Sequence, residues 1–270
     1  MKLFERIIRR LKGPPTDRPA GLASTQDLNE QKEKPIRLPA HRQAINALYA
    51  ERVGEISVTE SDLFRLVNYG HDGQFDYDLY KSIQTIANKG KLGAVFASEA
   101  NIQYLCARLE EMIPQVRFVL CHGTRNGTEQ RWFAQYLSKS VRVLGTEISD
   151  AADQFPDTIQ WDFHEIKEEW ISAADVIYSN SWDHAYDPEK MFRNWLKCLT
   201  VGGVMVIEWT TGHARSVVNA MDPLGMDLDD LLKFLSREEM GQTFDPPVLM
   251  QQELPDKRLD RAFVLVQRRR

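Results

Sequence analysis

Cysteines are few in this sequence of 270 residues, and it has no long apolar run. The three cysteines, Cys106, Cys121 and Cys198, are widely spaced and form no Cys-x-x-Cys pair, so we expect free thiols in a reducing compartment. No apolar run approaches the roughly 20 residues that a membrane-spanning helix needs. Charged residues interrupt the apolar positions near Met1, so we expect no secretory signal and a cytoplasmic protein.

The net charge of −5 is distributed unevenly along the chain. Residues 1–42 contain ten Lys and Arg against five Asp and Glu, so the remaining residues sum to −10. Affinity for nucleic acid depends largely on the neutralisation of phosphates, to which an acidic body is poorly suited. We therefore expect no nucleic-acid partner, and instead a small molecule, a protein or a membrane surface.

The first forty residues have a composition unlike the rest. Residues 1–12 place apolar side chains on one helical face and basic side chains mostly on the others, and a Gly-Pro-Pro sequence ends this pattern. We expect an amphipathic basic helix that contacts an anionic membrane or a partner, or else packs on its own domain. Residues 13–40 are rich in Pro, Gly, Ser, Thr, Gln and Lys, which predicts a flexible linker.

Two larger parts are expected after the linker. Residues 41–114 are predicted to form a helical cap, with helices at 41–53, 77–88 and 99–112 and a further one that begins within 58–62 and ends at Leu66. Residues 115–270 alternate amphipathic segments with short apolar runs. The expected strands cover 116–120, 141–146, 158–161, 174–178, 203–209, 248–253 and 262–267. This alternation is typical of an α/β fold with a doubly wound, mainly parallel, Rossmann-like sheet, whose last two strands can form an antiparallel hairpin at its edge.

A loop with two glycines follows the first expected strand of this sheet. It reads CHGTRNG, residues 121–127, and leads into a helix. Gly123 allows a tight turn and the close approach of a ligand, and Gly127 can serve the same end where the helix begins. Ligands in such folds bind at the carboxyl ends of the strands. Glu147 ends the second strand, where a carboxylate can accept hydrogen bonds from both hydroxyls of a ribose.

Polar residues also follow the third and fourth strands. The carboxylate of Asp162 can accept a hydrogen bond from an adenine amino group, and the backbone N–H of Phe163 can reach a ring nitrogen. The fourth strand leads into YSNSWDH, residues 178–184. A nicotinamide-binding Rossmann domain would use the same elements, but the first loop lacks the G-x-G-x-x-G spacing of that class.

The segment DVIYSNSWDHAYDPEKMFRNWLKCLTVGGVMVIEW, residues 175–209, resembles the class I S-adenosylmethionine-dependent methyltransferases. A polar loop after the fourth strand, a helix after Asp-Pro, and Leu-x-x-Gly-Gly before the fifth strand recur in that family. The resemblance covers residues 115–210 well, the remainder to 268 loosely, and residues 1–114 not at all. It implies S-adenosylmethionine as the cofactor, with its methionine portion in the loop 121–127. The residues that the resemblance assigns to the cofactor are Cys121, Gly123, Arg125, Gly127, Glu147, Asp162, Phe163 and Asn180.

Two positions in the loop depart from the family's pattern. Cys121 stands where the family has an acidic residue, and Arg125 stands where it has the middle glycine. Arg125 can pair with the cofactor's carboxylate, or it can repel the sulfonium. These departures keep a second hypothesis open, in which the protein is catalytically inactive and uses the fold to bind a partner. Glu147 and Asp162 favour the enzyme.

Methyl transfer to a hydroxyl requires that donor and acceptor are aligned and that a proton is removed. Asp183 and His184 follow the fourth strand, where an acceptor would meet the methyl group. His184 is the first candidate for the general base, with Asp183 as the alternative or as its orienting partner. His213, after the fifth strand, is a further candidate. The alternative for each histidine is a structural role.

The acceptor is less well defined by the sequence than the cofactor. Asp/Asn-Pro-Pro-Tyr, which is typical of amino-group methylation in nucleic acids, is absent after the fourth strand, where the chain has Asn180-Ser181-Trp182-Asp183. Several ligand-type residues stand at expected strand ends and could together hold a divalent cation: Asp162, His164, Asp183, His184 and His213. No pair of them has a tight spacing such as His-x-x-x-His, so we expect no metal. We predict O-methylation of a small-molecule or glycan-type acceptor. The oligomeric state stays open.

Overall fold

The computed structural model describes residues 38–70, 73–237 and 243–269, which belong to one compact unit. The predictions for residues 1–12 and for nearly all of the linker lie outside these described residues. Within the described part of the chain, no helix combines the length and the apolar character that crossing a bilayer would require.

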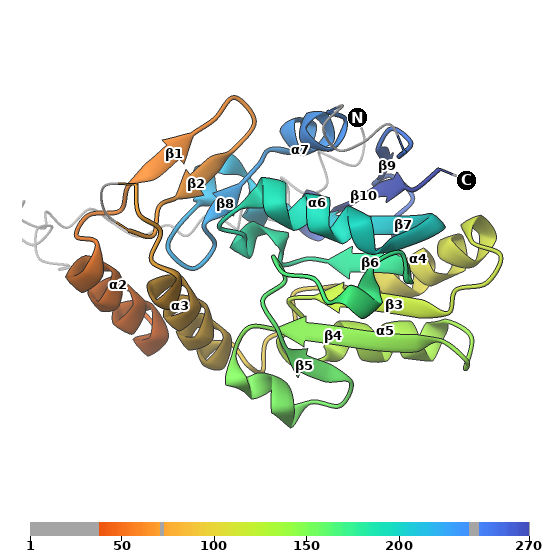
Figure 1. The fold of residues 1–270 in the computed structure, drawn as a ribbon, viewed down its shortest axis with the longest axis horizontal. Helices are drawn as coiled ribbons and strands as arrows, with labels where there is room; N and C mark the ends of the chain where they lie inside the picture. Colours follow the sequence, from red (N-terminus) through yellow and green to blue (C-terminus); the bar gives the residue numbers. More distant parts are fainter. Residues whose placement is uncertain (1–37, 71–72, 238–242, 270) are drawn as a thin grey trace, which may run out of the picture. The chain divides into compact units, whose positions relative to one another are not determined.

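A seven-stranded sheet forms the centre of the fold (Figure 1). Its strand order is β5-β4-β3-β6-β7-β10-β9. The strands are β3 (Phe118–His122), β4 (Arg142–Glu147), β5 (Thr158–Gln160), β6 (Ala174–Ser179), β7 (Leu199–Trp209), β9 (Val248–Met250) and β10 (Ala262–Gln267). The pairs among β3 to β7 are parallel, whereas β10 is antiparallel to both β7 and β9. The predicted mainly parallel α/β sheet and its antiparallel edge hairpin are confirmed.

Helices cover both faces of the sheet, because its central strands are apolar on both sides. On one face, α4 (Glu99–Met112) and α5 (Thr128–Tyr136) share a buried core with Val119 and Cys121 of β3. On the other face, α6 (Pro188–Cys198) and α7 (Leu228–Leu235) share a core with Leu120. Neighbouring residues of β3 therefore alternate between the two cores, as the period of two in a strand requires.

The elements before α4 form a layer of mixed structure. α2 (Ala40–Arg52) and α3 (Tyr77–Gly90) are the expected helices, and they share a third core. β1 (Val58–Glu60) and β2 (Arg65–Val67) pair as an antiparallel hairpin, to which β8 (Leu224–Gly225) adds a third strand. α4 packs on the sheet beside α5, although the predicted cap includes it.

The predicted helix ending at Leu66 is wrong, because this segment belongs to the hairpin. Ser61 does not cap a helix. Its backbone N–H donates to the carbonyl of Phe64 at 2.9 Å, and its hydroxyl accepts from the N–H of Leu63 at 3.3 Å, which closes a turn. β8, more than 150 residues away in the sequence, then supplies the backbone partners of β2. A pairing between such distant segments leaves no local signal in the sequence.

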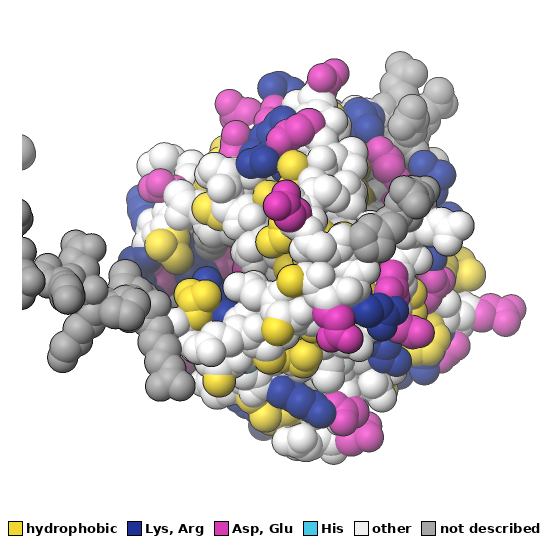
Figure 2. Space-filling view, turned by 90° about the vertical axis from the view of Figure 1, so that its left-hand side faces the viewer, with side chains coloured by type: hydrophobic (Ala, Val, Ile, Leu, Met, Phe, Trp, Pro, Cys, Tyr) yellow, Lys and Arg dark blue, Asp and Glu magenta, His cyan; other side chains and the backbone are white. Residues whose placement is uncertain are grey.

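The carboxyl ends of β4 and β6 point toward α3, as their arrowheads show in Figure 1. On the face of the molecule drawn in Figure 2, the described Lys and Arg side chains are interspersed with Asp and Glu, with hydrophobic side chains between them. That face therefore lacks the continuous positive surface that a nucleic-acid backbone requires.

Candidate functional site

A pocket lies between α3 and the carboxyl ends of β3, β4 and β6. The space between its lining residues is about 480 Å³, part of it open to solvent. Six of the predicted site residues line it: Gly123, Arg125, Glu147, Asp162, Phe163 and His184. The structure thus brings together residues from four separate loops of the sequence.

Gly123 occupies a position that only glycine fits. Its φ is +74°, and a Cβ atom built there would lie 2.6 Å from the Cβ of Ser181. The hydroxyl of Ser181 donates to the carbonyl of Gly123 at 3.0 Å, so the loops after β3 and β6 are in direct contact. Gly127, with φ of +69°, begins α5 but does not line the pocket. Gly123 and Ser181 both line the pocket, so the two loops together form part of its wall.

Arg125 directs its side chain toward the segment between α3 and α4. Its Nη1 donates to the carbonyl of Ala94 at 3.2 Å, and its guanidinium lies 4.9 Å from the centre of the Phe96 ring. Its backbone N–H points the other way and donates to Oε2 of Glu147 at 3.2 Å. The side chain that replaces the middle glycine is therefore already engaged at the pocket wall.

Glu147 is the last residue of β4 and is buried. Its Oε1 accepts from the backbone N–H of Ser149 at 2.9 Å, and burial raises the pKa of its carboxyl group. Asp162, after β5, accepts from both the backbone N–H and Nδ1 of His164, at 2.9 and 2.7 Å. Burial opposes ionisation of Asp162, but these bonds and the partner's charge lower its pKa. Both carboxylates are held in fixed orientations.

Besides Gly127, two further predicted cofactor residues, Cys121 and Asn180, do not line the pocket. The side chain of Cys121 packs in the core beneath α4 and α5, and burial raises the pKa of its thiol. Strand alternation places it there, because the residue stands one position from His122, which faces the other side of the sheet and stacks on Trp195 at 4.6 Å between ring centres. Asn180 is partly buried, and its Oδ1 accepts from the hydroxyl of Ser181 at 3.2 Å.

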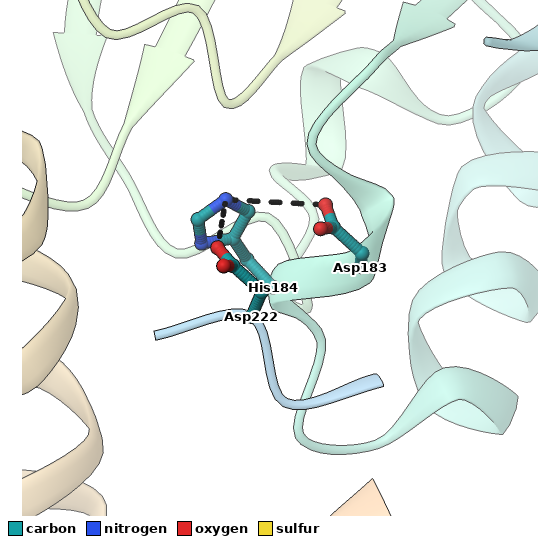
Figure 3. A group of neighbouring side chains, drawn as sticks. All are labelled: Asp183, His184 and Asp222. Carbon is teal, nitrogen blue, oxygen red and sulfur yellow. Dashed lines mark ion pairs between the residues drawn. The ribbon is translucent and has the colours of Figure 1, made fainter. Parts of the chain in front are cut away.

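Asp183 and His184 lie in η3 (Trp182–His184), a short 3₁₀ turn after β6 (Figure 3). Nδ1 of His184 lies 2.6 Å from Oε1 of Gln84 in α3. The amide of Gln84 is oriented by its own Nε2, which donates to the carbonyl of Met221 at 2.9 Å. Oε1 must therefore accept, which places the proton of a neutral His184 on Nδ1 and leaves a lone pair on Nε2.

His213 is held in the opposite tautomer. Its Nδ1 accepts from the backbone N–H of Thr210 at 3.0 Å, so its proton is on Nε2, which lies 3.8 Å from Oδ1 of Asp183. Burial lowers the pKa of His213 to about 4 and raises that of Asp183 to about 7. His213 thus faces Asp183 and has no free lone pair with which to accept a proton.

Sequence reasoning missed two lining residues of the pocket, Gln84 and Lys91, and a neighbour of His184 outside the lining, Asp222. Gln84 and Lys91 come from α3 and its end, and Asp222 comes from the loop before β8. Oδ1 of Asp222 lies 3.6 Å from Nε2 of His184 and 3.8 Å from Nζ of Lys91. No motif marks these residues, because each stands in a segment whose sequence indicates only helix or loop.

Solved methyltransferase structures share this fold. A 1,6-didemethyltoxoflavin-N1-methyltransferase from Burkholderia thailandensis, crystallised with 1,6-didemethyltoxoflavin and S-adenosylhomocysteine, matches at a TM-score of 0.55 and 14% identity, over 80% of this chain and 100% of that one. The CurJ carbon methyltransferase matches at a TM-score of 0.51 and 14% identity over 70% of this chain, which covers 59% of that protein, less than two thirds of it. No protein-family model and no curated protein matches the sequence. With the strand order of the sheet, these similarities show that the chain has the class I methyltransferase fold.

Proposed function

We propose that this protein is an S-adenosylmethionine-dependent methyltransferase that acts on a hydroxyl of a small-molecule or glycan-type acceptor. One observation carries the proposal: the glycine-containing loop, the carboxylate that ends β4 and the Asp-Phe pair after β5 line one pocket together with His184. These contacts suit a nucleoside, and the loop after β6 brings His184 to the same pocket.

The residues present fit the cofactor. Gly123 lines the pocket, and the absence of a Cβ atom there lets the loop after β6 approach it through Ser181. Glu147 would accept hydrogen bonds from ribose hydroxyls, and Asp162 with Phe163 would meet the adenine. When bound, S-adenosylmethionine supplies an electrophilic methyl group. The protein's part is to orient donor and acceptor in line and to exclude water.

The acceptor hydroxyl has to lose its proton for its oxygen to attack the methyl group. Nε2 of His184 is the unprotonated nitrogen at the pocket wall, so we assign it to assist this loss, with Asp183 beside it at 3.9 Å. His213 is then a positioning residue that contacts Asp183. His184→Gln distinguishes a base from a purely structural residue. A base at His184 predicts a loss of methyl-transfer activity in the folded variant, whereas a purely structural role predicts that activity is kept. The assay uses an acceptor found by screening hydroxylated compounds.

Calorimetric titration with S-adenosylmethionine, S-adenosylhomocysteine and NAD tests the cofactor. We expect micromolar binding of the first two only, and a loss of at least about tenfold in Glu147→Ala, because a charge-assisted hydrogen bond contributes roughly 1.5–3 kcal/mol. Glu168→Ala, at an exposed position, is the matched control. Absence of binding would overturn the proposal and favour the inactive protein that uses the fold to bind a partner.

The contact of residues 1–12 with an anionic membrane stays a prediction. Deletion of these residues should remove binding to vesicles that contain anionic lipid, because it removes both the apolar face and the basic residues. Unchanged vesicle binding would contradict it, and with it the glycan-type acceptor, which rests on a location at the membrane.

A further inference from the structure

One wall of the pocket is a stripe of side chains on α3. Tyr80, Gln84, Asn88 and Lys91 line the pocket at spacings of four, four and three residues, which places them along one face of the helix and its C-terminal end. From Tyr80 to Asn88 this face rises by about 12 Å. α3 therefore follows the length of the pocket.

The two ends of this stripe meet different parts of the pocket. At one end, the ring centres of Tyr80 and His164 are 6.1 Å apart, beside the Asp-Phe pair assigned to adenine. At the other end, Lys91 and Arg125 both lie over the ring of Phe96, at 5.9 and 4.9 Å from its centre. The adenine contacts are therefore at the Tyr80 end, which leaves the Lys91 end for the methionine portion of the cofactor.

Hydrogen bonds hold the segment after Lys91 on the glycine-containing loop after β3. The carbonyl of Leu92 accepts from Nδ2 of Asn126 at 2.9 Å, and the carbonyl of Ala94 accepts from Nη1 of Arg125 at 3.2 Å. Both donors belong to the loop to which the resemblance assigns the methionine portion. The arginine that replaces the middle glycine thus fixes the segment that begins at Lys91.

Asn88 and Lys91 carry polar groups that the protein itself leaves without a hydrogen bond. Asn88 is 7% exposed, and its buried Oδ1 has no hydrogen-bond partner within the described part of the chain. Lys91 is largely buried, and its Nζ lies 3.8 Å from Oδ1 of Asp222, which is beyond hydrogen-bond distance. Burying an amide oxygen or an ammonium group without a partner is costly, so each indicates a ligand group of the opposite kind.

We propose that Asn88 and Lys91 bind the amino-acid end of the cofactor, Lys91 through its α-carboxylate and Asn88 through its α-ammonium group. The inference rests on the proposed function, because it needs S-adenosylmethionine in the pocket. The two side chains stand three residues apart at the end of α3, and they offer a cation and an acceptor to a zwitterion whose two charged groups are likewise adjacent. Neither residue lies in the part of the sequence that resembles the methyltransferase family.

The neighbouring charges suit a zwitterion better than an anion alone. Burial lowers the pKa of Lys91, the charges of Asp222 and Asp183 raise it, and those of Arg125 and Arg42 lower it. A lone anion such as phosphate would meet two carboxylates there, whereas the ammonium group of an amino acid is attracted by them. The end of α3 therefore selects a cofactor that keeps both its carboxylate and its ammonium group.

Calorimetric titration of the full chain with three adenosyl thioethers tests the site. S-adenosylhomocysteine has the whole amino-acid end, S-adenosyl-3-thiopropylamine lacks only the carboxylate, and 5′-methylthioadenosine lacks both groups. We expect the wild type to bind S-adenosylhomocysteine about tenfold more tightly, or better, than either of the others. Lys91→Met should remove the advantage over S-adenosyl-3-thiopropylamine and change the affinity for 5′-methylthioadenosine less than about threefold.

Variants of Asn88 test the contact with the ammonium group. Asn88→Leu should weaken binding of both amine-bearing compounds about tenfold, because it removes the acceptor. Asn88→Asp keeps an oxygen at that place and should keep their binding. Lys81→Met, at an exposed position of the same helix, is the control and should bind all three compounds as the wild type does. Circular dichroism melts confirm that each variant is folded.

Two results would overturn the site. One is a wild-type chain that binds S-adenosylhomocysteine no more tightly than 5′-methylthioadenosine. The other is a folded Lys91→Met whose affinities for the three compounds change by one common factor or not at all, which would leave Lys91 with a structural role. In both cases the adenosyl compounds still bind, so the proposed cofactor stands. A wild type that binds none of the three rejects the proposed function and this site together.

Discussion

Oε1 of Gln84 in α3 accepts a hydrogen bond from Nδ1 of His184 at 2.6 Å, although the two residues stand 100 positions apart in the chain. This contact joins the layer before the sheet to the loop after β6. The hydroxyl of Tyr80, one turn earlier in α3, donates to the carbonyl of the same histidine at 3.0 Å. α3 therefore sets both the position and the tautomer of the side chain that faces the pocket.

The tautomer of His184 should be visible by ¹⁵N NMR. We expect the proton on Nδ1 in the wild type, and its transfer to Nε2 in Gln84→Leu, because the leucine offers no acceptor. Gln84→Glu keeps an oxygen at that place and should keep the proton on Nδ1. A wild-type spectrum with the proton on Nε2 would contradict the assigned geometry.

Gly123→Ala should lower the free energy of unfolding by more than the cost of placing an alanine in a left-handed backbone conformation. Gly54 also has a positive φ, +92°, but a Cβ there would meet nothing within 4 Å. Gly54→Ala should therefore cost only about 1–2 kcal/mol of unfolding free energy. Gly123→Ala adds the clash with Ser181 and should cost about 2–4 kcal/mol. Urea unfolding measures the loss of unfolding free energy in each variant. Equal losses would show that the loops after β3 and β6 move apart at little cost and so relieve the clash.

Arg125→Gly restores the glycine of the family pattern. The change removes the contacts with Ala94 and Phe96, which should cost about 1 kcal/mol of stability. Because the guanidinium is directed at those residues, we expect the ratio of the affinities for S-adenosylmethionine and S-adenosylhomocysteine to change less than about threefold, or roughly 0.7 kcal/mol. A tenfold shift in favour of the charged sulfonium would mean that Arg125 repels it.

Glu129, in the first turn of α5, should make stability depend on pH. Burial raises the pKa of its carboxyl group to about 7, from an ordinary value of 4.5. A raised pKa means that the folded state favours the protonated form, so stability is fully present below pH 4.5 and is lost as pH rises through 7.

Glu129→Gln mimics the protonated form and removes this dependence. The stability of the wild type relative to Glu129→Gln should fall by roughly 2–4 kcal/mol between pH 4 and pH 8, since one pKa unit corresponds to about 1.4 kcal/mol. Urea unfolding of both proteins across this range measures it. Parallel pH profiles would show that the pKa of Glu129 is the same in the folded and the unfolded protein.

The central sheet and much of the pocket could be predicted because their signals are local. Short apolar runs between loop residues predicted the strands of the seven-stranded sheet. A carboxylate directly after a parallel strand lies at the ligand edge wherever the strand is placed. Glu147 and Asp162 were found in this way. Cys121 was misjudged as a pocket residue, because a one-residue change of register moves a side chain to the other face of the sheet.

The hairpin of β1 and β2 shows where local reasoning fails. Ser and Asp within residues 58–62 favour a helix N-cap and a tight turn alike, and only the pairing of Leu66 with Leu224 decides between them.

The sequence by itself therefore determined the fold class, the strand that each pocket loop follows, and the residue types at the strand ends. The tertiary structure alone decided which nitrogen of each histidine carries the proton and which side chains lie beside it. Gln84 sets the tautomer of His184, Thr210 sets that of His213, and Asp222 adds a second carboxylate. Proton positions depend on hydrogen-bond partners, and here those partners come from segments that meet only when the chain is folded.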